Sequence, residues 1–351
     1  MLSNAVQGRG ARPGKKHRSY PQPGLRELLR NSSDRHGARP RTCNCHLCSR
    51  PTFKFKRPNL SCRTTLAASG KVAALLTALS KTKGQADVYA FVDSDALIQR
   101  NWLTELVGPL IDRSIGATTG FRWHFPLGGG FWSHVQAAWN ASGTNLLFST
   151  RYNFPWGGAT AVRSETLDNI GIEGAWANAI SDDMALNSAL RQRGYSVILL
   201  PQCTVATFTR TDLPHFLEWA TRQTTLTRIF NPRVWRYGLV AYAFLDFVFL
   251  LGLAGLGLGV TLTPIWFVPS ALLLTPAVSG FIRSSQRCST FGRALPHLKA
   301  EFERTCFPHA LASCLVPWFM IYSIAKSAMK HEIEWRGRKY ELMKMNDTAF
   351  P

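Results

Sequence analysis

Three long apolar stretches toward the carboxyl end constrain the fold of this chain more than any other feature of its sequence. Residues 238–262 contain one charged side chain, Asp246, and residues 263–282 and 307–325 contain none. A helix of about 20 apolar residues can cross a bilayer. All three stretches approach or exceed this length, although prolines interrupt the second and the third. Because three such stretches are difficult to bury in one soluble core, we predict that residues 238–330 form membrane helices.

Basic residues are concentrated at the beginning of the chain. The formal net charge is +20, and residues 1–70 alone hold 15 Lys and Arg against two acids. Residues 1–65 also lack an apolar period and are rich in Arg, Pro, Ser and Gly, which is typical of an irregular, disordered tail. The rest of the chain has no basic-aromatic stripe or recognition motif, so we predict no binding to nucleic acid.

The region between, residues 66–237, alternates short apolar runs with helical patterns. Runs typical of buried strands occupy residues 87–92, 115–121, 157–162 and 196–200. Helical patterns occupy residues 71–79, 102–111 and 182–193. The alternation predicts an α/β domain with a largely parallel sheet, followed by the membrane helices and by a tail at residues 331–351.

The strongest local signal for chemistry is Phe91-Val-Asp93-Ser-Asp95, in which an apolar run ends in two carboxylates. Ligands of α/β proteins bind at the carboxyl ends of strands. Two alternating carboxylates can hold a hard divalent cation, and the cation can neutralise a diphosphate. The alternative is a surface turn in which one Asp caps the next helix.

Two further motifs lie downstream. Asp182-Asp183 opens a predicted helix, where the helix dipole stabilises carboxylates. A functional role requires one of these acids to face the sheet edge and act as a general base on an acceptor hydroxyl. Gly157-Gly158 follows Trp156 and precedes a predicted strand. Glycines there either form a tight turn or let a ligand approach the backbone closely.

A fourth segment, His215 to Arg228, lies directly before the apolar stretches. Its apolar spacing suggests a helix along an interface. The alternative is a membrane-surface helix whose arginines meet lipid phosphates.

In this order, the four segments resemble the processive-type glycosyltransferases with a GT-A fold, and residues 70–342 are most similar to the ceramide glucosyltransferase family. The resemblance implies a GT-A-like nucleotide-diphospho-sugar transferase domain. It implies that Asp93 and Asp95 bind Mg²⁺ or Mn²⁺ together with the nucleotide diphosphate. It also implies that Asp183, beside Asp182, is the catalytic base. Lys71 resembles a family lysine, and we place it in the nucleotide-sugar site together with Gly157 and Gly158.

The family's Q/R-x-x-R-W motif is matched in part by Trp219-Ala-Thr-Arg222-Gln223. Arg222 is retained and can offer planar donors to a phosphate. Trp219 stands where the family has Gln or Arg, and Gln223 stands where it has Trp. By the resemblance, Trp219 and Gln223 are placed with Trp156 on the acceptor side of the site.

The two ends of the chain compare differently with the family. Trp335-Arg336 begins a segment similar to the family's ending, and we place it at the acceptor or the membrane interface. The family begins with a membrane helix and strands whose first acid contacts uracil, whereas the only acids before Asp87 here are Glu27 and Asp34. Either the sequence lacks the family's beginning or its donor site is rebuilt, and we favour the first.

The resemblance implies a multi-pass membrane enzyme that transfers a hexose, glucose from UDP-glucose, to the hydroxyl of a lipid such as ceramide, with inversion. Arg222 would stabilise the departing diphosphate. Basic residues beside the membrane segments favour a cytosolic catalytic domain. The alternatives are a non-catalytic GT-A remnant in the membrane and a transferase acting on another lipid or on a polysaccharide.

Overall fold

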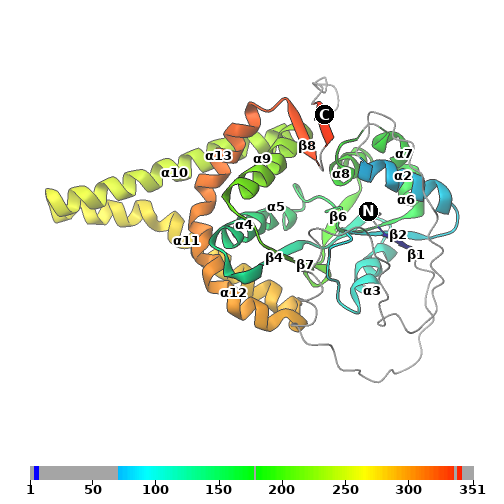
Figure 1. Cartoon of the computed structure of the whole chain (residues 1–351), viewed down its shortest axis with the longest axis horizontal. Helices are drawn as coiled ribbons and strands as arrows, with labels where there is room; N and C mark the ends of the chain where they lie inside the picture. Colours follow the sequence, from blue (N-terminus) through cyan, green and yellow to red (C-terminus); the bar gives the residue numbers. More distant parts are fainter. Residues whose placement is uncertain (1–3, 8–69, 178, 336–337, 342–351) are drawn as a thin grey trace. The chain divides into compact units, whose positions relative to one another are not determined.

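The computed structural model describes residues 4–7, 70–177, 179–335 and 338–341. A five-stranded sheet is the centre of the α/β part (Figure 1). Its strands, in spatial order, are β1 (Asn4–Gln7), β2 (Val88–Val92), β5 (Ala159–Arg163), β3 (Ile115–Thr119) and β6 (Ser196–Leu199). β1 falls within the predicted irregular tail, and the rest of that tail lies outside the described residues.

The pairing of these strands differs from the predicted, largely parallel sheet. β5 pairs antiparallel with both β2 and β3, and β3–β6 is the parallel pair among the described strands of this sheet. That prediction is therefore wrong, because an apolar run marks a buried strand but not its direction, which depends on the connections. Val92 at the end of β2 pairs with Ala159 at the start of β5. Residues that precede β5 consequently lie at the same edge as residues that follow β2 and β3.

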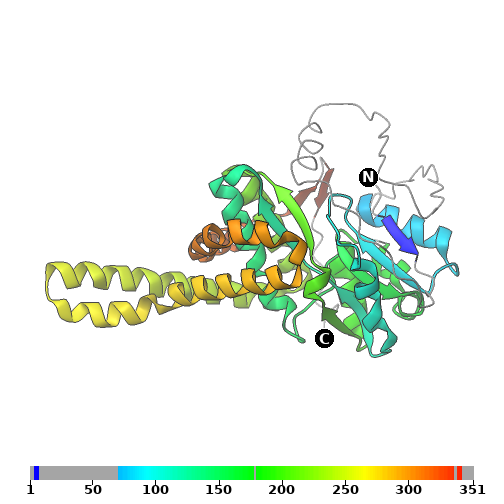
Figure 2. The same ribbon diagram turned by 90° about the horizontal axis from the view of Figure 1, so that it is seen from below.

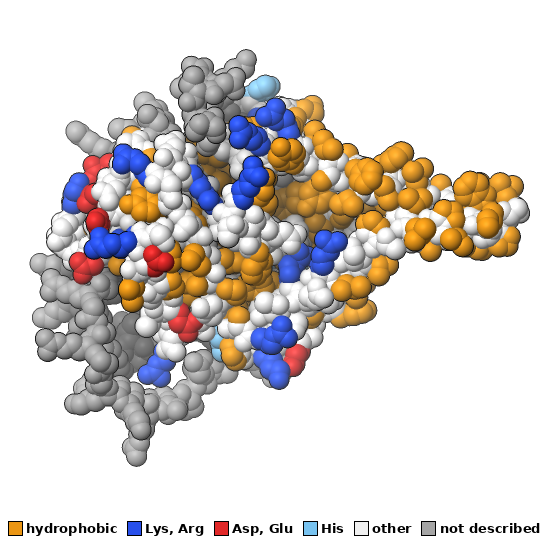
Figure 3. Space-filling model, turned by 180° about the vertical axis from the view of Figure 1, so that it is seen from behind, with side chains coloured by type: hydrophobic (Ala, Val, Ile, Leu, Met, Phe, Trp, Pro, Cys, Tyr) orange, Lys and Arg blue, Asp and Glu red, His pale blue; other side chains and the backbone are white. Residues whose placement is uncertain are grey.

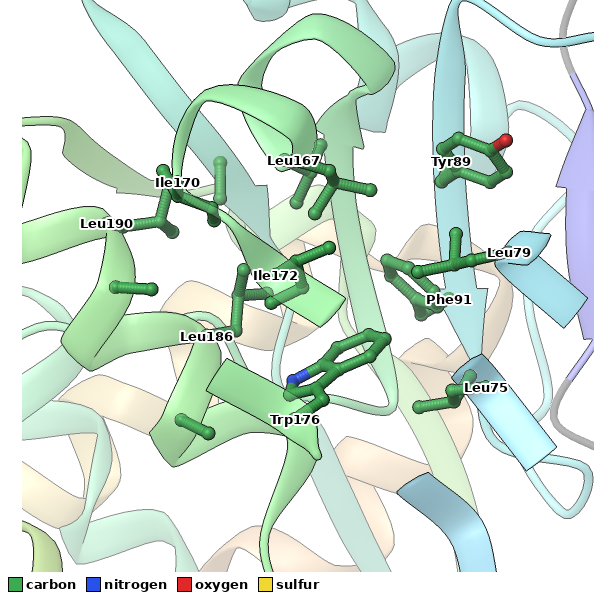
Figure 4. Packing of buried hydrophobic residues seen from close by; sticks show 14 of the residues in the cluster. Leu75, Leu79, Tyr89, Phe91, Leu167, Ile170, Ile172, Trp176, Leu186 and Leu190 are labelled. Carbon is green, nitrogen blue, oxygen red and sulfur yellow. The ribbon is translucent and has the colours of Figure 1, made fainter. Parts of the chain in front are cut away.

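Helices cover both faces of the sheet. On one face lie α2 (Gly70–Thr82), α6 (Ser164–Asn169), α7 (Ile172–Trp176) and α8 (Asp182–Gln192), and on the other lies α3 (Trp102–Val107). Figure 4 shows the first of these interfaces, where Phe91 of β2 packs beside Leu75 and Leu79 of α2. The rings of Phe91 and Trp176 meet edge to face with centroids 5.9 Å apart. Buried side chains of α8 belong to the same cluster, so α2, α7 and α8 are all packed against the sheet.

A second, two-stranded sheet joins the α/β part to the apolar helices. It consists of the parallel strands β4 (Arg122–Pro126) and β7 (Val205–Thr209), which the apolar pattern did not identify. Beside it lie α4 (Phe131–Ser142) and the short α5 (Thr144–Leu147), together with parts of α11 (Phe267–Ala294) and α12 (Lys299–Ala312). The ring centroid of Trp123 in β4 lies 5.0 Å from that of Phe291 and 5.1 Å from that of Phe302. Parts of α11 and α12 are thereby packed directly against the second sheet.

The first two predicted membrane stretches form a helical hairpin. α9 (Leu213–Phe230) is followed, after Asn231 alone, by α10 (Pro232–Thr261), because Pro232 cannot continue the preceding helix. α10 and α11 lie side by side (Figures 1 and 2). Apolar side chains cover much of the hairpin surface (Figure 3). The apolar windows of the two segments are only 17% and 6% buried, and both helices are long enough to cross a membrane.

The two helices of the hairpin approach closely through glycines. A Cβ on Gly255 would lie 2.3 Å from the Ser270 hydroxyl, and one on Gly259 would lie 2.7 Å from the Phe267 ring. Small residues that let two backbones approach are typical of helix pairs in membranes. The close contact between α10 and α11 therefore agrees with a helical hairpin that lies in a membrane.

The third predicted stretch, residues 307–325, lies in the helical segment Pro296–Ala328, which is also long and apolar enough to cross a membrane. α12 ends at Ala312, a short turn covers Ser313–Leu315, and α13 (Val316–Ala328) follows. The apolar window of this segment is 39% buried, more than in the hairpin, because α12 packs on α4 and α13 packs on α9. Beyond α13 the backbone forms a hairpin of β8 (Glu332–Trp335) and β9 (Arg338–Glu341).

Candidate functional site

The first carboxylates of the site lie in the loop that follows β2. Asp93 leaves the strand and donates its backbone N–H to the carbonyl of Gly158, at 3.3 Å. Its own carbonyl accepts from Ala96, which closes a tight turn around Ser94 and Asp95. The turn projects both acids from the sheet edge into a cleft rather than into the core.

Lys71, in the first turn of α2, joins two of the predicted acids. Its ammonium lies 3.3 Å from a carboxylate oxygen of Asp93 and 2.9 Å from one of Asp182. It also donates to the carbonyl of Gly157 at 3.4 Å. One cation thus holds the loop after β2, the turn before β5 and the start of α8 together. The carboxylates of Asp93 and Asp182 consequently face one shared cleft.

Arg122, at the first position of β4, completes the charge cluster and was not identified from the sequence. Its Nη2 lies 2.6 Å from Asp93 and 3.1 Å from Asp95. The guanidinium carbon also lies 5.1 Å from the ring centroid of Trp156, in a cation–π arrangement. Arg122 directly follows the predicted strand 115–121. This position at the end of a strand is the sequence feature that could have identified it as a site residue.

The Gly157-Gly158 pair is required by close packing in the turn before β5. A Cβ on Gly157 would lie 2.5 Å from a carboxylate oxygen of Asp182. A Cβ on Gly158 would lie 2.2 Å from the Trp156 ring and 2.6 Å from a carboxylate oxygen of Asp93. Side chains at these two positions would displace the acids from Lys71 and Arg122.

We therefore expect Gly157→Ala and Gly158→Ala to destabilise the protein by about 1–3 kcal/mol, as overpacking does. Gly174→Ala is the matched control, because a Cβ there meets nothing within 4 Å. Thermal unfolding of the detergent-solubilised chain measures the effect. Melting temperatures equal to that of Gly174→Ala would show that the turn has room for a side chain.

The two acids at the start of α8 have different surroundings. Asp182 is buried, its carbonyl accepts from the indole N–H of Trp176 at 2.9 Å, and its carboxylate binds Lys71. Asp183 is half-buried and lines the cleft, and its carboxylate accepts from the Ser181 hydroxyl and, at 2.8 Å, from the Met184 N–H. Asp182 is thus ion-paired, whereas the carboxylate of Asp183 has only neutral donors among these contacts.

Burial and neighbouring charges shift the pKa values of Lys71 and Asp182 in opposite directions. Burial alone would lower the pKa of Lys71, but the carboxylates of Asp182 and Asp93 outweigh it and hold that pKa above its ordinary value. Burial raises the pKa of Asp182, and the neighbouring ammonium of Lys71 opposes the rise. The ion pair between them therefore keeps a carboxylate charged in a place that disfavours charge.

The far wall of the cleft is formed by α9 and by the start of α10. Trp219, Arg222 and Gln223 of α9 all line it. The Trp219 ring meets that of Trp139 edge to face, with centroids 5.1 Å apart. Beyond them α10 contributes Trp235 and further residues up to Tyr242. The cleft thus extends from the charged sheet edge to the base of the apolar hairpin.

The cleft has a volume of about 1760 Å³. It is lined by every predicted site residue before position 224, namely Lys71, Asp93, Asp95, Trp156, Gly157, Gly158, Asp182, Asp183, Trp219, Arg222 and Gln223. Trp335 is described only through its backbone, which pairs with Arg338 in the β8–β9 hairpin. Arg336 lies outside the described residues.

Comparison with protein families matches residues 58–347 to glycosyl transferase family 21. A search of curated proteins found no match. The matched segment covers most of the chain and contains the whole described cleft. The chain therefore belongs to glycosyl transferase family 21, the ceramide glucosyltransferase family.

Proposed function

We propose that this protein transfers a hexose, glucose from UDP-glucose, to the hydroxyl of a membrane lipid such as ceramide. The observation that supports this most is the Lys71 bridge between Asp93 and Asp182, which sets both acidic motifs around one cleft. The opposite end of the same cleft reaches the apolar hairpin. A polar nucleotide sugar and an apolar alcohol would thus enter one cavity from two directions.

In this proposal the lipid hydroxyl attacks the anomeric carbon of the sugar from the side opposite the diphosphate. A bond forms between the hydroxyl oxygen and the anomeric carbon, the bond from that carbon to the phosphate oxygen breaks, and the configuration inverts. Asp183 accepts the hydroxyl proton. Arg222, which lines the same cleft, donates hydrogen bonds to the departing UDP.

Asp183 fits the role of base better than its neighbours do. Asp182 is buried and already paired with Lys71. His124 also lines the cleft, but burial, together with Arg122, lowers its pKa to about 3. A group with so low a pKa is a weak proton acceptor near neutral pH. Asp183 is the remaining acid at the start of α8 that is partly open to the cleft.

The residues present fit a divalent cation at Asp93 and Asp95. Both carboxylates accept from the same nitrogen of Arg122, so their oxygens converge on a point that favours positive charge. Among the described residues there is no group of three or more metal-ligating side chains. Mg²⁺ is commonly bound through one or two carboxylates together with substrate phosphates. Asp93 and Asp95 would hold Mg²⁺ or Mn²⁺, which would neutralise the diphosphate.

Removal of divalent cations with EDTA is accordingly expected to reduce transfer by at least about tenfold, and added Mn²⁺ or Mg²⁺ to restore it. Isothermal titration calorimetry with UDP-glucose, with and without Mn²⁺, measures how much the cation contributes to donor affinity. Asp95→Asn should remove much of this contribution. Full activity in EDTA would contradict this assignment and leave Lys71 and Arg122 as the cations that face the diphosphate.

The charge distribution of the hairpin supports a cytosolic catalytic domain. Arg233 and Arg236 precede the apolar part of α10, and Arg283 and Arg287 follow that of α11. Because the two helices pack together as a hairpin, these basic groups lie at the same end of it. Basic residues flanking membrane spans favour the cytosolic side.

The test is transfer by the full chain reconstituted in phosphatidylcholine vesicles containing ceramide, with UDP-glucose labelled in the sugar. Labelled glycolipid, identified by mass spectrometry, is the expected result. Product with another sugar or lipid but not with these would correct the substrate assignment. Failure with every donor and acceptor, together with undetectable UDP-sugar binding, would favour a non-catalytic remnant.

A further inference from the structure

A pair of arginines at the base of the hairpin faces a second hollow, separate from the charged sheet edge. Arg283 and Arg287 lie one helical turn apart on α11, and Asn145 of α5 lies opposite them. The hollow has a volume of about 180 Å³. A liquid water molecule occupies roughly 30 Å³, so the hollow admits a group of several heavy atoms.

The hydrogen-bond partners of the two guanidinium groups among the described residues are neutral. Arg287 donates to the side-chain oxygen of Asn145 at 3.1 Å, and Arg283 donates to the Ser279 hydroxyl at 2.8 Å. The Nε of Arg287 is buried and has no hydrogen-bond partner in the described part of the chain. Within that part, neither arginine forms a salt bridge, and no Asp or Glu lines the hollow. Like charges at positions i and i+4 of a helix repel one another, and an anion between them would relieve this repulsion.

The position of the hollow identifies the kind of anion. Residues 263–282 carry no charge, and Arg283 is the first charged residue after them. The arginine pair is therefore at the level where an apolar helix would leave the hydrocarbon. Phe148, 53% exposed, also lines the hollow. Aromatic and basic side chains together are typical of the membrane interface, where lipid phosphates are the abundant anions.

We propose that Arg283, Arg287 and Asn145 bind the phosphate of an anionic membrane phospholipid. Arginine offers a planar fork of donors that fits phosphate, and both arginines line the hollow. The lipid's acyl chains would lie along the exposed apolar surface of α11. This binding requires only that the hairpin lies in a bilayer. Asn145 also lines the large cleft, whereas Arg283 and Arg287 line only the hollow among these two cavities.

The site is tested with the full chain in a non-ionic detergent, using native mass spectrometry to count bound lipid. Dioleoyl phosphatidic acid is compared with dioleoylglycerol, which has the same acyl chains but no phosphate. The wild-type protein should bind dioleoyl phosphatidic acid at least about tenfold more tightly than dioleoylglycerol. Arg287→Gln should weaken binding of dioleoyl phosphatidic acid about tenfold, which corresponds to about 1.4 kcal/mol. Arg293→Gln, an equal charge change at an exposed site on the same helix outside the hollow, should leave it unchanged.

Two further variants separate a specific site from general attraction and from misfolding. Arg287→Lys keeps the charge but loses the planar fork, so it should bind the lipid more weakly than wild type. Asn145→Asp keeps both arginines but supplies an internal carboxylate, so it should raise the melting temperature without lipid and weaken lipid binding. If the Arg287 and Asn145 variants bind the lipid as wild type does, or if Arg293→Gln weakens binding equally, the proposal is wrong. Displacement of the lipid by an equal concentration of inorganic phosphate would also overturn it, because the ligand would then be free phosphate.

Discussion

Replacement of Asp183 by Asn should reduce the rate of sugar transfer by about 10²–10⁴-fold, which is the usual contribution of a general base. The amide is nearly isosteric with the carboxylate and can still accept hydrogen bonds from Ser181 and Met184. The loss should therefore appear in kcat, while the affinity for UDP-glucose stays close to that of wild type. Steady-state kinetics in ceramide-containing vesicles, with donor binding measured separately, gives both quantities.

The matched control for this experiment is Glu165→Gln, an equal charge change at an exposed site that pairs with Arg113 on the surface. It should transfer sugar at the wild-type rate. Asp183→Asn with full transfer activity would refute the assignment of the base. Asp182→Asn is informative beside it, because we expect that variant to act through the position of Lys71 and to lower donor affinity as well as kcat.

Replacement of Lys71 by Met should destabilise the protein by about 3–5 kcal/mol, because it leaves a buried charge without its partner. The side chains concerned are 23% and 7% exposed for Lys71 and Asp182, so solvent screens this pair little. The expected result is a melting temperature lower by roughly 10 °C. Lys83→Met is the control, since Lys83 is 59% exposed and its ion pairs with Glu173 and Asp168 lie on the surface. Its melting temperature should remain close to that of wild type.

The pH dependence of the Lys71→Met variant provides a second measurement. Burial raises the folded-state pKa of Asp182 above the ordinary value of 3.8, and removing Lys71 raises it further. An acid whose pKa is higher in the folded state than in the unfolded state destabilises the fold when it is ionised. The resulting loss of folding free energy grows as the pH rises from 3.8 to the folded-state pKa. Wild type has the same penalty up to about pH 6, where its own Asp182 titrates. The variant should therefore recover stability relative to wild type as the pH falls from its own, higher Asp182 pKa toward about 6. Adding Asp182→Asn should restore much of the loss at neutral pH, and an equally unstable double variant would contradict the explanation.

Much of the local structure could be predicted from residue patterns. The apolar run at 87–92 became β2, the pattern at 182–193 became α8, and the first two apolar stretches became the hairpin helices. These segments have long apolar runs or a clear helical period, so a local pattern of residues is enough to identify them. β4 and β7 were missed because strands of five residues with mixed polarity have no distinct period. The third apolar stretch lies in the segment Pro296–Ala328, where a short turn at Ser313–Leu315 stands between α12 and α13.

Residue patterns alone indicate that acids follow a buried strand, that a second acidic pair opens a helix, and that apolar helices come after both. That these features share one cleft follows from the packing of the folded chain. β5 runs antiparallel to β2, so Gly157 and Gly158 lie at the same edge as Asp93, whereas in a parallel sheet they would lie at the opposite edge. Lys71 and Arg122 then hold that edge together through contacts across 22 to 111 positions of the chain. Strand direction and contacts between distant residues depend on how the whole chain packs, and no local pattern of residues encodes them.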